Sequence, residues 1–393
     1  MKKIGMILLM LVSGGILSAQ NAIDRVLAEI EKNSTTLVAL QQSRDAEQLA
    51  NKSGLFPHNP EVEFHYLWGN PSVIGNRTDF SVKQLFDYPT AYTYKSQLSR
   101  LKNQQLEWEY RKQRNELRYR VASVCVELLY HNALQEELQK RHAHAVALAD
   151  ACKAAYNLGD VNVLAHNKAQ VHLLQVWHAL ENNEIARQAL LSELAAFNGG
   201  QAIHFTDSQL DMPAIAPDFE AWIADAESTN PLLQWVKQEV AIAGKEVRLS
   251  RSLGLPKIFA GYMSEKVETE QFRGVSVGIS IPLWEHANAV KEAKARTLAA
   301  QSLETDAVAQ FYHTLKGGYT KAITLQNHLS DYRAELLQYT PNALLQKALD
   351  KGEISLPEYL YELSFYYSAI DSLLQAERSF NAAYYELMQY CEY

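Results

Sequence analysis

Helix-breaking residues are missing from long stretches of this sequence. The chain contains 17 glycines and 11 prolines, yet none falls between Ala91 and Leu158. Because glycine costs a helix interior about 1 kcal/mol and proline about 3 kcal/mol, this run can continue as one helix about 100 Å long. Gly159 ends it, as glycine commonly does just past a helix end, and a second such run continues to Phe197. The stretch therefore predicts a long helical hairpin with its tip at Gly159.

Cysteine is scarce as well. The three cysteines lie far apart, at positions 125, 152 and 391, and their odd number and spacing predict no disulfide framework. No glycine-rich phosphate loop and no nucleophile elbow occurs in the sequence, and these are the motifs that commonly indicate catalysis. We therefore expect no enzyme and no cofactor.

The chain has no basic excess and no clear metal-binding motif. Its net charge is −8, which argues against nucleic-acid binding, since that usually requires a basic stripe. Twelve histidines are present, but His142 and His144 are spaced so that they point to different helix faces. No His-Glu-x-x-His motif occurs. Solvated histidines on helix faces are the expectation, with no metal site.

After residue 19, no apolar run reaches the roughly 18–20 residues that a transmembrane helix needs. Residues 1–19 themselves read as a signal peptide: Lys2 and Lys3 precede a short apolar core, and Leu17-Ser18-Ala19 offers a cleavage site. The mature protein is therefore expected outside the cytoplasm, and any membrane span has to be made of strands.

The long hairpin occurs twice. A second one is expected from about residue 285 to residue 390, with its tip at Gly352. When Gly159 is superimposed on Gly352, Asp160 meets Glu353 and Phe197 meets Tyr390. An internal repeat of this kind determines the architecture before any single motif does. We divide the chain into a first repeat (20–198), a linker (199–217) and a second repeat (218–393).

Each repeat begins with helical segments and then changes to a period of two. Helical patterns at 21–51 and 218–250 are interrupted at Asn33-Ser34 and at Asn230-Pro231. Strands are expected at 61–68, 79–86, 257–267 and 275–284, where apolar and polar residues alternate to different degrees. In the second repeat, Gly317-Gly318 and Pro341 interrupt the long helix and could kink it.

The alternation in the last strand is the clearest. Val277, Ile279 and Ile281 alternate with serine, glycine and proline. Strands with one apolar face match those of a transmembrane barrel, in which these three side chains are expected to face lipid. Aromatic residues near strand ends, among them Trp68, Phe86, Tyr88 and Trp284, suit an interfacial girdle. A soluble sheet packed on helices would alternate in the same way, so both interpretations remain open at this level.

The order helix, strand, strand, long hairpin, repeated over the whole mature chain, resembles the TolC-like outer-membrane efflux channel family (outer membrane factors). Short motifs carry the resemblance: Asn230-Pro231-Leu232-Leu233, Ile281-Pro282-Leu283-Trp284, and the tips Tyr156-Asn157-Leu158-Gly159 and Lys351-Gly352-Glu353-Ile354-Ser355. Asn59-Pro60-Glu61-Val62 and the modest length are most similar to the heavy-metal efflux branch. No cysteine follows the cleavage site, although many members of that branch are lipidated there.

The resemblance implies a mostly α-helical fold with transmembrane β-structure. Three protomers form one 12-stranded barrel in outer-membrane lipid, and their helices form a tunnel through the periplasm. The implied partners are a periplasmic adaptor and an inner-membrane pump of the RND type. The implied function is passive export, with heavy-metal cations as cargo. A tunnel for type I protein secretion and a periplasmic coiled-coil scaffold are the alternatives.

The resemblance also implies roles for particular residues. The tips, with Gly159, Asp160, Gly352 and Glu353, would dock the adaptor or the pump. Glu358 and Glu362, just past the second tip, are the candidates for an acidic gate at the periplasmic entrance. From the sequence alone, Asp160 and Glu353 are expected to cap the returning helices, and Glu358 can equally be a solvated glutamate in the first turn of a helix.

Overall fold

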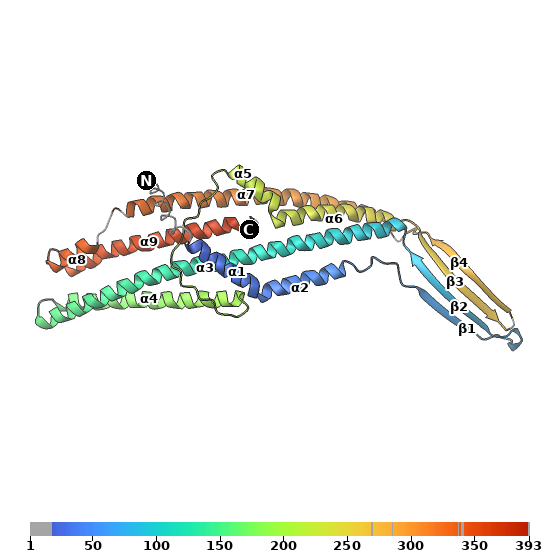
Figure 1. The fold of residues 1–393 in the computed structure, drawn as a ribbon, viewed down its shortest axis with the longest axis horizontal. Coiled ribbons are helices and arrows are strands. Elements are labelled where there is room, and N and C mark those ends of the chain that lie inside the picture. Colours follow the sequence, from blue (N-terminus) through green and yellow to red (C-terminus); the bar gives the residue numbers. More distant parts are fainter. Residues whose placement is uncertain (1–17, 269, 285, 337, 339–341, 392–393) are drawn as a thin grey trace, which may run out of the picture. The chain divides into compact units, whose positions relative to one another are not determined.

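The computed structural model describes residues 18–268, 270–284, 286–336, 338 and 342–391. The predicted signal peptide therefore lies almost entirely outside the described residues. Helices dominate the described chain, and four strands make one sheet (Figure 1). Among the described helices, none is long and apolar enough to cross a membrane.

The first repeat has the predicted order of elements. The two short helices and two strands lead into a hairpin of two long helices, with these bounds: α1 Ser18–Asn33, α2 Thr35–Ala50, β1 Glu61–Leu67, the 3-10 turn η1 Ser72–Ile74, β2 Arg77–Phe86, α3 Pro89–Leu158 and α4 Val163–Phe197. Helix α3 is 70 residues long, as the absence of glycine and proline predicts.

The second repeat has the same order of elements, but two described helices precede its tip where one does in the first repeat. Its elements are α5 Phe219–Thr229, α6 Pro231–Leu253, β3 Lys257–Val267, β4 Glu270–Ser280, α7 Ala289–Leu336, α8 Asn342–Asp350 and α9 Leu356–Met388. Residues 337 and 339–341 between α7 and α8 lie outside the described residues, and so does the kink predicted at Pro341.

The glycine pair in this repeat has another role than the predicted kink. Helix α7 continues through Gly317 and Gly318 without interruption. A Cβ atom on Gly318 would lie 3.0 Å from the Leu387 side chain, so the missing side chain allows α7 and α9 to approach closely.

Local sequence explains where the helices begin. The Asn162 side chain accepts a hydrogen bond from the Ala165 amide at the start of α4. Asn230 accepts from the amides of Leu232 and Leu233, and Pro231 follows it at the first position of α6. Asparagine as N-cap and proline at the first helical position are both favoured there.

The four strands form an antiparallel sheet in the order β1-β2-β3-β4. The register pairs Phe64 with Phe80, Phe80 with Ser264, and Ser264 with Arg273. Strand β4 begins at Glu270 and ends at Ser280, so the predicted range 275–284 was wrong at both ends. The charged residues of the Glu270–Arg273 segment obscured the alternation at its start, and Pro282 lies beyond the hydrogen-bonded ladder.

By internal contacts the chain divides into two compact units, and each unit contains part of both repeats. The second unit comprises Ala39–Gln113 and Glu227–Tyr312, and it holds the sheet. Polar bonds join its helices: Glu107 on α3 accepts from Arg44 and Gln48 on α2, and Glu239 on α6 accepts from Gln105 at 2.6 Å.

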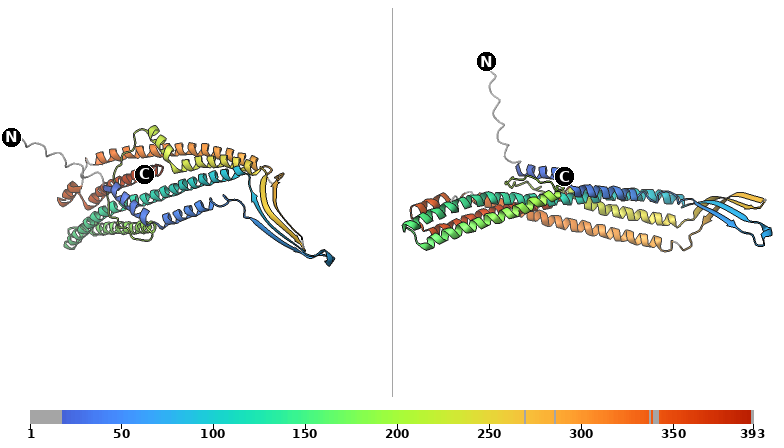
Figure 2. Two further views of the ribbon diagram at one scale, coloured as in Figure 1. Left: turned by 45° about the vertical axis from the view of Figure 1, so that its right-hand side comes forward. Right: turned by 90° about the horizontal axis from the view of Figure 1, so that it is seen from below.

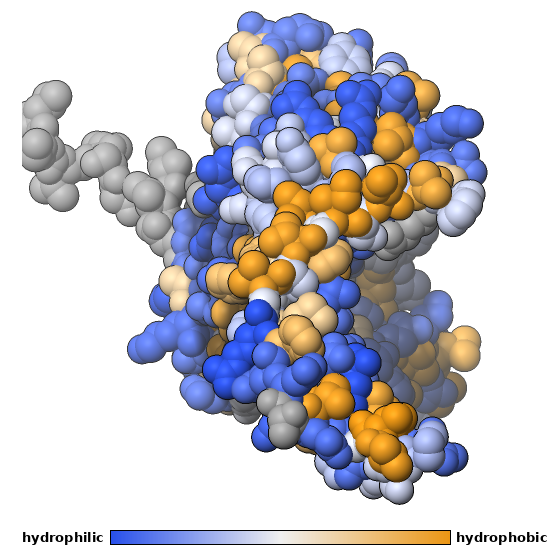
Figure 3. All heavy atoms as spheres, turned by 90° about the vertical axis from the view of Figure 1, so that its right-hand side faces the viewer, coloured by the Kyte–Doolittle hydropathy of each residue, from blue (hydrophilic) through white to orange (hydrophobic). Residues whose placement is uncertain are grey.

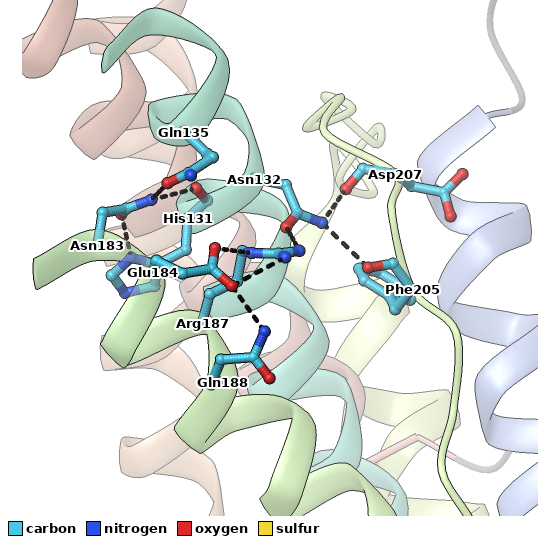
Figure 4. A network of polar contacts seen from close by, with 9 residues as sticks. All are labelled: His131, Asn132, Gln135, Asn183, Glu184, Arg187, Gln188, Phe205 and Asp207. Atoms are coloured by element: carbon cyan, nitrogen blue, oxygen red, sulfur yellow. Dashed lines mark hydrogen bonds and ion pairs between the residues drawn. The ribbon is translucent and has the colours of Figure 1, made fainter. Parts of the chain in front are cut away.

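The first unit comprises Met1–Val38, Arg114–Ala226 and His313–Tyr393. The buried residue Asn132 of α3 binds the linker between the repeats. Its side-chain nitrogen donates to the carbonyl oxygens of Phe205 and Asp207, and its side-chain oxygen accepts from Arg187 of α4 (Figure 4). Glu184 in turn binds the Arg187 guanidinium at 2.9 Å. This network satisfies buried linker backbone groups that would otherwise cost stability.

Candidate functional site

Both helical hairpins turn with the same backbone geometry. Gly159 and Gly352 have φ values of 84° and 70°, which is the left-handed conformation that favours glycine. The amides of Asp160 and Glu353 each bond to the carbonyl five residues earlier, and the two glycine amides bond three residues earlier. This is the Schellman motif, and it sharply ends α3 and α8.

The carboxylates beside the two glycines do not have the expected capping role. The N-caps of the returning helices are Asn162 for α4 and Ser355 for α9, two residues beyond Asp160 and Glu353. Neither carboxylate is needed for the caps. Asp160 and Glu353 are exposed at the tips, where a partner could contact them.

Glu358 has a defined structural role. Its carboxylate accepts hydrogen bonds from the Ser355 amide at 2.8 Å and from the Ser355 hydroxyl at 2.7 Å, and together they form a capping box. The hydrogen bond from the Ser355 backbone is the main reason why the pKa of Glu358 lies below its usual range. The Ser-x-x-Glu spacing carries this signal, which the sequence analysis missed. Glu362, one turn later, is exposed.

The tips of the two hairpins pack on each other through an apolar cluster. Leu148, Ala149 and Cys152 of α3, Ala169 of α4, and Tyr359 and Leu363 of α9 form its buried part. Tyr359 also joins three helices, because its hydroxyl lies 2.9 Å from His144 Nε2 on α3 and donates to Gln346 Oε1 on α8 at 2.9 Å. Burial raises the pKa of Tyr359 to about 12, so this hydroxyl stays protonated at neutral pH.

An ion pair between the buried Arg141 and the half-exposed Asp371 connects α3 with α9 further from the tips. The Arg141 side chain is only 7% exposed, and it donates to both Asp371 oxygens, at 3.1 Å and 2.8 Å. Its guanidinium also lies 4.4 Å from the centre of the Tyr367 ring. Bidentate pairs of this kind fix geometry as well as charge, so Arg141 holds the two hairpins in register.

A groove runs between α4 and α9 close to the tips. It has a volume of about 550 Å³, and it is lined by apolar groups such as Leu164, Val171 and Tyr361 together with Lys168 and His172. Leu164, Val171 and Tyr361 are exposed, and Tyr361 stacks edge-on with the exposed Phe365 at 4.8 Å. Exposed apolar groups gathered in a groove are typical of a protein-binding surface.

The sheet has two chemically different faces. One face, which we call the apolar face, is formed by the following residues and their cross-strand partners: Val62, Phe64, Tyr66, Phe80, Val82, Ile258, Tyr262, Val275, Val277 and Ile279. The opposite, polar face carries all five carboxylates of the strands: Glu61, Glu63, Asp79, Glu265 and Glu270. Cross-strand partners share a face, so the strand register alone makes this assignment.

The apolar face is not covered by other parts of the described chain. Val275, Val277 and Ile279 are 83%, 75% and 62% exposed. Figure 3 shows apolar side chains gathered as an orange band on the side that carries the sheet, and neither Figure 1 nor Figure 2 shows a described helix of the second unit across the sheet. Ile281, the third residue predicted to face lipid, lies just beyond β4 and is also exposed.

Metal chemistry finds little support in the described residues. They contain no group of three or more histidine, cysteine, aspartate or glutamate side chains that could hold a metal ion. Cys125 and Cys152 are buried and free, and burial raises the pKa of the Cys125 thiol to about 12. Such thiols are unreactive at neutral pH.

No family model matches the sequence, and no curated protein matches it either. Solved structures do match. A membrane protein from Pseudomonas aeruginosa is 14% identical with a TM-score of 0.78, over 95% of this chain and 93% of that one. The CmeC outer membrane channel of Campylobacter jejuni is 12% identical with a TM-score of 0.73, over 95% of this chain and 85% of that one. CusC, described for its transmembrane channel formation, is 15% identical with a TM-score of 0.72, over 94% of this chain and 92% of that one.

These similarities extend over nearly the whole chain and establish the fold class. The chain has the TolC-like fold, with its duplicated arrangement of strands and long helical hairpins, as the sequence predicted. At 12–15% identity the comparisons assign the architecture, and function has to be argued from the surfaces described above.

We expect the tips to loosen at acidic pH. Burial, and then the nearby His144, lower the pKa of His172, so below about pH 6.5 the unfolded chain binds more protons than the folded one. Stability of the tips should therefore fall as the pH drops from about 6.5 through the lowered pKa of the folded state. Hydrogen exchange of residues 140–175, measured from pH 7.5 to 5 and corrected for intrinsic rates, would show this as faster exchange.

The substitution His172→Gln should reduce this acid effect, because it removes the titrating group. His178→Gln is the matched control, since His178 lies on the same helix but is exposed. An equal acid response in native protein and in His172→Gln would contradict the prediction.

Proposed function

We propose that this protein is the outer-membrane channel subunit of a tripartite efflux system and acts as a passive conduit, not as an enzyme. The observation that carries the proposal is the uncovered, two-faced sheet. An apolar face exposed to water would be costly, at about 25 cal/mol per Å². In a bilayer the same face would lie against lipid, and the carboxylates of the other face would line a water-filled lumen.

The sheet also supports a homo-oligomer. Strands β1 and β4 each pair with one other strand within the described chain. In hydrocarbon, every unpaired backbone group costs several kcal/mol, and the smallest closed barrels have eight strands. Pairing β4 of one protomer with β1 of the next satisfies both edges. Three protomers give the twelve-stranded barrel of the TolC-like architecture, so we propose a homotrimer.

The alternative of a periplasmic coiled-coil scaffold is disfavoured by the same face. A soluble scaffold would cover Val275, Val277 and Ile279 with helices, as antiparallel sheets generally cover one apolar face, and the described helices do not do so. The long hairpins are then proposed to extend from the outer membrane into the periplasm, with their tips farthest from the lipid.

The register predicts how the last strand tolerates charge. Val275 lies in the middle of β4, opposite Tyr262. Val275→Arg should impair outer-membrane assembly, because an arginine on the lipid side costs about 2–4 kcal/mol near the midplane. Ser276→Arg, on the polar face of the same strand, is the matched control and should assemble almost normally. Membrane fractionation and detergent extraction, with trimer content measured after extraction, provide the measurement.

Two results would count against the proposal. Native protein recovered in the soluble periplasmic fraction would favour the scaffold. Equal tolerance of arginine at positions 275 and 276 would reject the assignment of the apolar face to lipid.

We propose the groove between α4 and α9 and the tips around Gly159, Asp160, Gly352 and Glu353 as the docking surface for a periplasmic adaptor and, through it, an inner-membrane pump of the RND type. The exposed apolar groups Leu164, Val171 and Tyr361 support this proposal. Glu358 and Glu362 remain the proposed acidic gate. In a trimer each would occur three times, and close carboxylates repel one another unless a cation lies between them.

The capping box allows the charge of Glu358 to be tested separately from its structural role. Glu358→Gln preserves the cap, because glutamine fits the same position, but removes one negative charge per protomer. We expect weaker block by divalent cations in single-channel recordings, and a similar effect for Glu362→Gln. Unchanged block in both variants, with native helix content by circular dichroism, would leave the two residues as surface groups.

We further propose heavy-metal cations as the cargo, selected by the pump. The excess of carboxylates on the polar face, five against Arg77, Lys83 and Lys257, supports a lumen that admits cations. Deletion of the gene should increase sensitivity to zinc, copper, cobalt or cadmium. Sensitivity to bile salts and dyes alone would reject metal cargo, and loss of a secreted protein would favour a type I secretion tunnel.

A further inference from the structure

Most charged residues of the sheet lie on its polar face. All five strand carboxylates and three of the five lysine and arginine residues lie on the polar face. The apolar face has only two charged residues, Lys266 of β3 and Arg273 of β4, and both are exposed cations. Two cations without a carboxylate on the same face require an explanation, because lysine and arginine are costly on a lipid-facing surface.

The two cations lie at one end of the apolar face. The register row that contains Lys266 consists of Tyr66, Thr78, Lys266 and Gln271, and Arg273 belongs to the nearest row of the same face, two residues further along the strands. Both rows are close to the turns that join β1 to β2 and β3 to β4. The opposite end of the sheet, where Ile258 pairs with Ile279, connects to the long helices and is apolar.

Neutral groups hold Arg273 in place. Its Nη2 donates to Gln271 Oε1 at 2.6 Å, and Gln271 Nε2 donates to Ser264 Oγ at 3.2 Å. Within the described chain, neither Lys266 nor Arg273 has a carboxylate within ion-pair distance. Glu265 and Glu270 lie on the polar face, and the Glu268 side chain in the turn packs against Gly75. The two positive charges are therefore not neutralised by the part of the chain that the structure describes.

The neighbouring aromatic residues indicate the depth of this end of the sheet. Tyr66 shares the row of Lys266, and its ring contacts that of Trp68 edge-on at 5.4 Å. Tyrosine and tryptophan gather at the level of lipid head groups, where lysine and arginine cost about 0–1 kcal/mol instead of the 2–4 kcal/mol at the midplane. The row is thus suited to the boundary between hydrocarbon and water.

We propose that Lys266 and Arg273 bind the phosphate groups of an anionic, lipid A-type glycolipid in the outer leaflet. The inference rests on the proposed function, which directs the helices to the periplasm and hence the strand turns to the outside. Guanidinium and ammonium groups are good donors to phosphate oxygens, and acyl chains would lie along Tyr262, Val275 and their neighbours. The three protomers of a trimer would present three such sites.

Native mass spectrometry of the delipidated, detergent-solubilised trimer would test the site. The added lipids are bis-phosphorylated lipid A, the same lipid without phosphate, and zwitterionic phosphatidylethanolamine. Binding should favour the bis-phosphorylated lipid. The double variant Lys266→Gln/Arg273→Gln should bind it about tenfold or more weakly, since it removes both charged donors to the phosphate oxygens.

The control is Lys83→Gln/Lys257→Gln, which removes the same charge from the polar face and should bind as the native protein does. Equal binding of lipid with and without phosphate, or equal affinity of the double variant, would overturn the inference. Full competition by millimolar inorganic phosphate would overturn it as well, because it would indicate a free-anion site. A chain that forms trimers in the outer membrane but shows no lipid preference would reject this inference alone and leave the channel proposal standing.

Discussion

The need of backbone amide and carbonyl groups for hydrogen-bond partners governs this structure. A four-stranded sheet satisfies its inner strands, but β1 and β4 each have one strand neighbour in the described chain. In water such edges can bond to solvent, whereas in hydrocarbon they cannot. Under the proposed function, the exposed apolar face would lie in the second environment. The two edge strands would then need further copies of the chain as partners, so the proposal joins assembly and membrane insertion.

The same requirement explains why so much of the chain is helical. A helix satisfies its own backbone, so it can extend for 70 residues, as α3 does, without support from a neighbouring strand. Packing is then needed only to hold helices in register. Polar and charged contacts do this at a few points, such as Arg141 with Asp371 and Asn132 with the linker carbonyls. These partners lie far apart in the sequence. Within the unit that contains them, the first contact fixes one hairpin against the other, and the second fixes the linker against the first hairpin.

Much of this could be predicted from the sequence, because the decisive signals are local. Long runs without glycine or proline, and glycine at each tip, determine the hairpins. Signals that depend on tertiary context were misinterpreted. The pair Gly317-Gly318 suggests a kink, but it serves close packing against Leu387. Strand β4 was predicted to begin five residues too late, because Glu270 and Arg273 interrupt its apolar pattern, and the two belong to opposite faces. Only the register with β3 shows this.

The sequence also could not distinguish a gate residue from a capping residue at Glu358. Its carboxylate accepts two hydrogen bonds from Ser355. A carboxylate held by two donors is less free to move towards a cation, and this weakens the simplest argument for a constricting ring. Glu362 has no such role in the cap and is exposed one turn further along α9. If an acidic ring exists at the entrance, the geometry therefore makes Glu362 the more adaptable member, with Glu358 contributing a fixed charge at the start of the helix.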